Sequence, residues 1–149
     1  MARPNKILVA FDGSPHSKKA LEWAIDLNHY THGSVVVVHV SEPVHLTSLY
    51  GTEGSNARLL AEAIKEVEAE DRKTLEEAKI YCENRAVNVK TELLYGNIAE
   101  TIIKYAQDER MDLIIAGTKG HGKLEELLMG SVTRNLVSLS HIPVLVVKD

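Results

Sequence analysis

Cysteine is nearly absent from the chain, because Cys82 is the only one among 149 residues. No disulfide can therefore form within the chain, and such scarcity is typical of proteins that work in a reducing compartment. We interpret Cys82 as a small apolar residue that packs, because free cysteine is among the most buried residue types.

Long apolar runs are also missing. No stretch approaches the ~20 apolar residues that a membrane-spanning helix needs. The first apolar run, residues 7–11, is too short for the core of a signal peptide, and no cleavage pattern follows it. We therefore expect a cytoplasmic protein that has no membrane as a partner.

The chain has no run of basic residues. Its 17 Lys and Arg residues are outnumbered by 21 Asp and Glu residues, and the formal net charge is -4. Nucleic-acid-binding domains usually carry a basic patch, so we expect no nucleic-acid partner. With 44% apolar and 26% charged residues, the chain has the composition of one globular domain, which we assign to residues 1–149.

The seven histidines form no zinc pattern. His29 and His32 lie near each other in the sequence, but no cysteine or second pair follows at the spacing of a zinc site. We expect His39, at the end of an apolar run, to pack rather than to catalyse. His121 differs from the others because it lies in a glycine-rich segment.

Strand and helix patterns alternate along the chain. Apolar runs bounded by turn residues predict strands at residues 7–11, 35–40, 87–93, 113–116 and 144–147. Helical spacing predicts a helix that starts at Ser14 and Pro15, and others over residues 60–82, 98–106 and 132–139. Asp71 interrupts the apolar stripe of the longest helix. Residues 41–55 are predicted to form a loop, a candidate lid or partner-binding surface.

This alternation predicts a parallel sheet covered on both faces, a doubly wound, Rossmann-like α/β fold. Such sheets bind ligands beyond the carboxyl ends of their strands, where the strand order reverses. In a sheet of order 3-2-1-4-5, the first and fourth strands are neighbours at that point. Asp12 follows the first strand and Gly117 follows the fourth, so the two residues would flank one crevice.

Residues 117–133 carry the pattern of an anion site. Glycines let the backbone approach phosphate oxygens, and successive N–H groups can form a nest for an anion. Gly130 and Ser131 open a helix, whose free N–H groups and positive dipole end favour phosphate. Lys119 adds positive charge, and Thr133 adds a hydroxyl. This combination favours anion binding over the alternative of a simple surface turn.

Two common nucleotide motifs do not fit this segment. The dinucleotide pattern G-x-G-x-x-G is absent. The P-loop pattern G-x-x-x-x-G-K-[ST] runs from Gly117 but fails at Leu124, which has no hydroxyl for magnesium. We therefore exclude a Walker-type NTPase.

A third pattern does fit: G-x2-G-x9-G-[ST], formed by Gly117, Gly120, Gly130 and Ser131. It resembles the motif of the ATP-binding branch of the universal stress protein family. The resemblance extends over the whole chain, with similar segments at residues 6–14, 37–40, 112–118, 130–133 and 143–147. It implies a five-stranded parallel sheet of order 3-2-1-4-5.

The resemblance also implies a ligand, ATP or another adenine nucleotide, with Mg²⁺ or Mn²⁺ as candidate companions of the phosphates. It places Val40 against the adenine and Asp12 beside the nucleotide, near any phosphate-bound metal ion. The candidate nucleotide-binding residues are Ala10, Asp12, Val40, Gly117, Lys119, Gly120, His121, Gly130, Ser131, Val132 and Thr133. From the residues alone, Asp12 has a second interpretation as a turn residue.

The resemblance further implies a stress-response protein that forms a homodimer through residues 144–147. Pairing with a second copy would cover an apolar edge strand there, although the last helix could shield it instead. We find no evident catalytic base with a defined partner, and we expect a sensor or switch with little or no turnover and an unidentified protein partner. Two alternatives stay open: a slow ATPase or phosphotransferase, and a nucleotide-independent dimeric interaction protein.

Overall fold

The computed structural model describes residues 3–42, 49–51, 54–119 and 129–148. All five of its strands are parallel, in one sheet of order β3-β2-β1-β4-β5. This result confirms the predicted fold class and strand order. The elements are β1 (Lys6–Ala10), α1 (Pro15–Thr31), β2 (Ser34–Ser41), α3 (Ser55–Glu83), β3 (Val89–Tyr95), α4 (Ile98–Asp108), β4 (Leu113–Gly117), α5 (Ser131–Leu139) and β5 (Val144–Val147).

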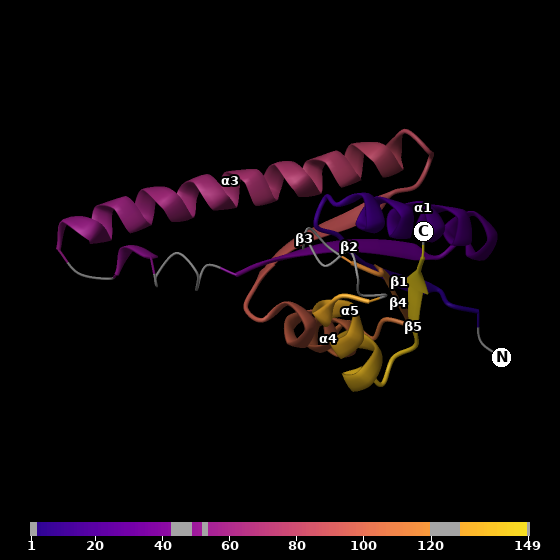
Figure 1. Cartoon of the computed structure of the whole chain (residues 1–149). Coiled ribbons are helices and arrows are strands. Elements are labelled where there is room, and N and C mark those ends of the chain that lie inside the picture. Colours follow the sequence, from indigo (N-terminus) through magenta and orange to yellow (C-terminus); the bar gives the residue numbers. More distant parts are fainter. Residues whose placement is uncertain (1–2, 43–48, 52–53, 120–128, 149) are drawn as a thin grey trace.

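The sheet is the middle of three layers (Figure 1). α1 and α3 cover one face, whereas α4 and α5 cover the other. Side chains of the central strands alternate between the layers: Val9 and Val37 pack on the side of α1 and α3, and Leu8 and Val38 pack on the side of α4 and α5. Because both faces are buried, these strands read as continuous apolar runs rather than alternating ones.

The turn after β1 and the start of α1 follow the prediction. Ser14 is the N-cap, and its hydroxyl oxygen accepts a hydrogen bond from Ser17 N at 3.2 Å. Pro15 is the first helical residue. α1 ends at a C-cap, His32, which adopts a left-handed φ of 56° one residue before the predicted stop at Gly33.

β2 is one residue longer at each end than predicted. It runs from Ser34 to Ser41, because β3 supplies a pairing partner as far as Tyr95. The carbonyl of Ser41 also accepts a hydrogen bond from Gly96 N at 3.2 Å. The predicted loop at residues 41–55 therefore loses Ser41 to β2 and its last residue to α3, and residues 43–48 and 52–53 lie outside the described residues.

β3 begins two residues later than predicted, at Val89. Val87 is buried, but it belongs to the turn after α3, where Ala86 adopts a left-handed φ of 59°. The N–H of Val87 donates to the carbonyl of Cys82, at the end of the helix. An apolar residue that caps a helix can thus be mistaken for the start of a strand.

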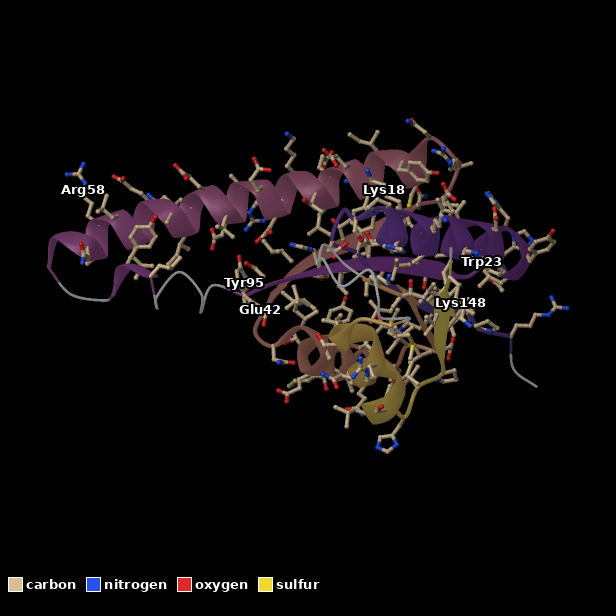
Figure 2. The ribbon with its side chains drawn as sticks, viewed as in Figure 1. Lys18, Trp23, Glu42, Arg58, Tyr95 and Lys148 are labelled. Carbon is tan, nitrogen blue, oxygen red and sulfur yellow. The ribbon has the colours of Figure 1, made fainter. Side chains whose placement is uncertain are left out.

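α3 has two unlike halves. Leu75, Ala78 and Cys82 in its second half are buried against the sheet, which confirms the packed interpretation of Cys82. The first half projects beyond the sheet (Figure 1), and Figure 2 shows Arg58 near its far end. No helix within the described ranges is both long and apolar enough to cross a membrane.

Candidate functional site

A cavity of about 140 Å³ lies at the carboxyl ends of β1, β2 and β4, where the strand order reverses. Three walls enclose it: the strand ends, α4 with α5, and the first turn of α1. The lining residues are Ala10, Phe11, Asp12, Ser17, Val38, His39, Val40, Ile98, Ile102, Ala116, Gly117, Lys119, Val132, Thr133 and Leu136. This is where open parallel sheets bind ligands.

The fold gathers most of the predicted site residues around this cavity. Those that line it are Ala10, Asp12, Val40, Gly117, Lys119, Val132 and Thr133. Gly130 and Ser131 lie beside it, at the start of α5. Gly120 and His121 fall outside the described residues, so the middle of the glycine motif stays a prediction.

One wall of the cavity is apolar. It is formed by Val38 and Val40 of β2, Ile98 and Ile102 of α4, and Leu136 of α5. Ile102 and Leu136 are also members of the core cluster on this face, so rigid packing holds the wall in place. Apolar cavities with a few polar groups at the mouth are typical of small-molecule sites.

The turn after β1 brings Asp12 to the cavity and fixes its orientation. Asp12 Oδ1 accepts a hydrogen bond from Ser14 N at 2.9 Å, and Gly13 adopts a φ of 81°. The turn interpretation of Asp12 is therefore correct. It is compatible with the site interpretation, because the same residue lines the cavity.

The end of β4 and the start of α5 are tied together. Gly130 N donates to the Thr118 carbonyl at 2.7 Å, and the Thr133 hydroxyl donates to the Gly117 carbonyl at 2.7 Å. These bonds hold the N-terminus of α5 against the cavity. The Thr133 hydroxyl proton is engaged in the fold, which differs from the expected role as a ligand donor.

Gly117 is required by a close approach of α1. A Cβ atom at this position would lie 2.7 Å from the backbone carbon and oxygen of His16. On the same side, the Thr118 hydroxyl lies 3.5 Å from His16 Nδ1. Gly130 is different: a Cβ atom there would meet Lys119 Cα and the Thr118 oxygen at 3.6 Å, which is ordinary contact.

The opposite wall contains a polar pair that the sequence analysis did not identify. His39 Nε2 lies 2.8 Å from Asp71 Oδ1, and His39 Nδ1 lies 2.8 Å from the Phe11 carbonyl oxygen. The prediction that His39 packs is correct, but its polar partner was not foreseen. The signal was the carboxylate of Asp71, which interrupts the apolar stripe of α3.

The cavity contains no ready-made metal centre. In the parts of the chain that the structure describes, no group of three or more His, Cys, Asp or Glu side chains is arranged to hold a metal ion. The carboxylate at the cavity is that of Asp12.

Comparison with known proteins identifies the family. The universal stress protein family matches residues 4–148 of this chain. The chain belongs to this family. It is 34% identical over 146 residues to the universal stress protein YxiE of Bacillus subtilis, which covers 97% of this chain and 99% of the relative.

Solved structures of the universal stress protein family share the fold. The structure of MJ0577 from Methanocaldococcus jannaschii superposes with a TM-score of 0.87 at 30% identity, over 99% of this chain and 98% of that one. A second solved member is in complex with cAMP; it has a TM-score of 0.69 and 20% identity, over 99% of this chain and 98% of that one. A third is in complex with dAMP; it has a TM-score of 0.65 and 19% identity, over 97% of this chain and 98% of that one. The dAMP complex is of a protein from Archaeoglobus fulgidus. At these identities the two complexes establish the shared fold alone.

Proposed function

We propose that this universal stress protein binds an adenine nucleotide, with ATP as the first candidate. It would act as a cytoplasmic regulatory switch of the stress response with little or no turnover. The observation that carries the proposal is the meeting of an apolar cavity and a helix N-terminus at one edge of the sheet. A nucleotide needs both, because its base is apolar on its faces and its phosphates are anionic.

The apolar wall suits the base. Val40, Ile98 and Ile102 offer apolar surface for the faces of the ring. Some members of the fold hold cAMP or dAMP, which supports the view that this architecture accommodates adenine nucleotides.

The start of α5 suits the phosphates. Its N-cap, Gly130, makes no side-chain capping bond, and the first N–H groups of a helix attract anions together with the helix dipole. Lys119 lines the cavity from the end of β4 and adds positive charge. The G-x2-G-x9-G-[ST] motif of the ATP-binding branch, which spans this region, favours ATP over a ligand without phosphates.

A charge change at Gly130 tests this assignment. The φ of −71° and the ordinary contact distances at this position admit a Cβ atom, and Asp and Asn are both good N-caps, so Gly130→Asp and Gly130→Asn should keep α5 intact. The Asp variant adds a negative charge beside the phosphates, and it should bind ATP at least about tenfold more weakly than the Asn variant.

Adenosine serves as the ligand control for that pair. Both variants should bind adenosine equally well in calorimetric titrations, since it has no phosphate to repel. Equal ATP affinities in the two variants would contradict the proposal that the phosphates bind at the start of α5.

A divalent ion would fit beside the phosphates. Mg²⁺ is commonly held by one or two carboxylates together with substrate phosphates, and Asp12 brings one carboxylate to the cavity. The residues therefore fit a metal that arrives with ATP rather than one held by the protein alone. ATP affinity should rise with Mg²⁺ in the native chain and respond less in Asp12→Asn; an identical response would contradict a metal contact at Asp12.

Turnover of ATP has little support from the residues at the cavity. Among the described residues, His39 is the imidazole that lines the cavity, and both of its ring nitrogens are already hydrogen-bonded to the fold. A general base must reach the group from which it takes a proton. We expect the native protein to release phosphate from ATP no faster than the Gly130→Asp variant does. Steady phosphate release by the native protein that is lost in Gly130→Asp would instead support the slow ATPase or phosphotransferase.

We also propose that the protein forms a homodimer through β5. This strand pairs with β4 alone within the described sheet, and its residues Val144, Leu145 and Val146 are apolar and only half-buried. Exposed apolar edges tend to pair with another chain. Val146→Lys should halve the mass in sedimentation, whereas Ile80→Lys on α3, a residue that is 49% exposed, should leave it unchanged. A native monomer, or a Val146→Lys dimer, would contradict this interface.

A further inference from the structure

A histidine–aspartate pair connects the long helix α3 to the cavity. His39 Nε2 and Asp71 Oδ1 are 2.8 Å apart, and each side chain is only 14% exposed. On its other side, the His39 ring contacts the Phe11 carbonyl oxygen through Nδ1 at 2.8 Å. The ring therefore spans from α3 to the end of β1.

Both neighbours of the ring are hydrogen-bond acceptors. A carbonyl oxygen accepts only, so Nδ1 must carry a hydrogen to bond Phe11. A carboxylate also accepts only, so Nε2 must carry a second hydrogen to bond Asp71. A neutral imidazole has one N–H and a carboxylate has no hydrogen to donate. Two hydrogen bonds donated by the ring therefore require one additional proton on the pair. An imidazole binds a proton more tightly than a carboxylate does, which places this proton on His39.

The bond to Phe11 bears directly on the site. Phe11 lies between Ala10 and Asp12, which both line the cavity, and its N–H donates to the Val38 carbonyl at 2.9 Å. The backbone of Phe11 is thus held by β2 from its N–H and by His39 from its carbonyl. Loss of the second bond would free the turn that orients Asp12.

We propose that the His39–Asp71 pair is a positioning device for the nucleotide site, which holds the end of β1 in its binding geometry only while His39 is protonated. This inference rests on the proposed nucleotide function. It predicts that ATP binds more weakly as the pH rises through the range in which His39 releases its proton. The neutral ring has a single N–H, and the charged Asp71 carboxylate competes for it more strongly than the Phe11 carbonyl, so the bond to Phe11 is the one that is lost.

Other charged groups around the pair come from each neighbouring element. Glu68 and Arg72 lie on α3 beside Tyr95 of β3, whose hydroxyl donates to Glu68 at 3.3 Å. Burial raises the pKa of the Tyr95 hydroxyl, with a further increase from Glu68, so this group is neutral across the physiological pH range. Figure 2 shows Tyr95 lying at the end of the sheet below α3.

A further charged group lies at the cavity, where Asp12 lines it together with His39. Asp71 Oδ2 is buried and has no hydrogen-bond partner within the described part of the chain. A buried carboxylate of this kind needs a nearby positive charge, and the protonated His39 supplies it.

The Asp71→Asn variant tests whether the additional proton on His39 matters apart from the hydrogen bond between residue 71 and His39 Nε2. An asparagine amide can donate to Nε2 of a neutral ring while Nδ1 still donates to Phe11. The Asn variant therefore keeps both bonds without the extra proton. Asp71→Ala removes the bond, and His29→Ala, at an exposed position of α1, controls for the loss of an unrelated histidine.

ATP titrations at about pH 6 and about pH 8.5 test the proposal. Native protein and His29→Ala should lose affinity at the higher pH about fivefold more than Asp71→Asn, the size expected from one hydrogen bond. Ionisation of ATP itself is common to all variants. In Asp71→Ala no carboxylate competes for the ring hydrogen, so the neutral ring can still donate from Nδ1 to Phe11, and ATP affinity should depend on pH no more than in Asp71→Asn. Equal pH profiles in the native protein and Asp71→Asn would overturn the proposal.

Nitrogen NMR of the His39 ring makes the result independent of ATP binding. In the native protein at about pH 6, both ring nitrogens should be protonated, whereas in Asp71→Asn only Nδ1 should be. A native ring with a single protonated nitrogen would overturn the proposal even if ATP binds. Protonation of both nitrogens in a protein that binds no ATP would instead contradict the proposed nucleotide function, and with it the positioning role of the pair.

Discussion

Two of the cavity's walls differ in chemistry and in how the chain builds them. The wall beside α4 and α5 is apolar and includes Val40 and Ile102, whereas in the wall at the strand ends His39 lines the cavity and is hydrogen-bonded to Asp71 of α3, which does not line it. The first wall arises from residues that the core needs anyway. The second brings a carboxylate into the fold, at a cost that only a specific partner offsets. Shape thus comes from one wall and orientation from the other.

The largest effect is expected on the apolar wall. Ile102 is 2% exposed and belongs to both the cavity and the core. Ile102→Ala should lower the free energy of unfolding by about 3 kcal/mol, through lost apolar burial and a residual cavity, and should weaken adenosine binding. Ile80→Ala makes the same change at a residue that is 49% exposed, and it should cost under about 0.5 kcal/mol in chemical denaturation. Similar costs for the two would refute the assignment of this wall.

A smaller effect is expected where α1 meets the end of β4. Gly117→Ala forces a Cβ atom against the His16 backbone at 2.7 Å, and it should cost about 2 kcal/mol through overpacking. Gly130→Ala, which meets only ordinary contacts, should cost less than about 1 kcal/mol. Denaturation curves of the two variants compare them directly. If Gly117→Ala were as stable as Gly130→Ala, the close approach of α1 would be wrong.

The side of α1 and α3 should also respond to alkaline pH. Burial raises the pKa of the Cys82 thiol from 9.0 to about 11, with Arg85 opposing and Glu83 adding to the shift. A raised pKa in the folded state means that the neutral thiol stabilises the fold fully below pH 9.0, and that this contribution is lost as the pH rises through about 11. The native protein should therefore lose up to about 2 kcal/mol more stability over this range than Cys82→Ala. Parallel pH curves would contradict it.

The smallest effect is expected on the projecting half of α3. Arg58 and Glu62 form an ion pair at 3.4 Å, with side chains that are 87% and 58% exposed. Arg58→Ala should change the free energy of unfolding by less than about 0.5 kcal/mol, because solvent screens such pairs, and should leave ATP affinity unchanged. A marked loss of affinity would show that this half of α3 takes part in the site.

The fold could be predicted from the sequence nearly in full, because each strand and helix carries its own periodic pattern. Errors occurred where tertiary contacts decide a boundary: β3 prolongs β2 to Ser41, and Val87 caps a helix instead of starting a strand. The apolar part of the site was predicted only in part: Val40 was named through the family resemblance, whereas Ile102 and Leu136 were expected only as members of helices. The link between His39 and Asp71 was not predictable, because the two residues are 32 positions apart and meet only after α3 packs on the sheet.

Calorimetric titration of the native protein with ATP, ADP and AMP, with and without Mg²⁺, tests the central claim most directly. The account predicts saturable binding of ATP at one site per chain, with the heat signal lost in Gly130→Asp and kept in Gly130→Asn. If correctly folded protein in the calorimeter gave no heat of binding with any of the three nucleotides, this result would contradict nucleotide binding. The nucleotide-independent dimeric interaction protein would then be the function to pursue.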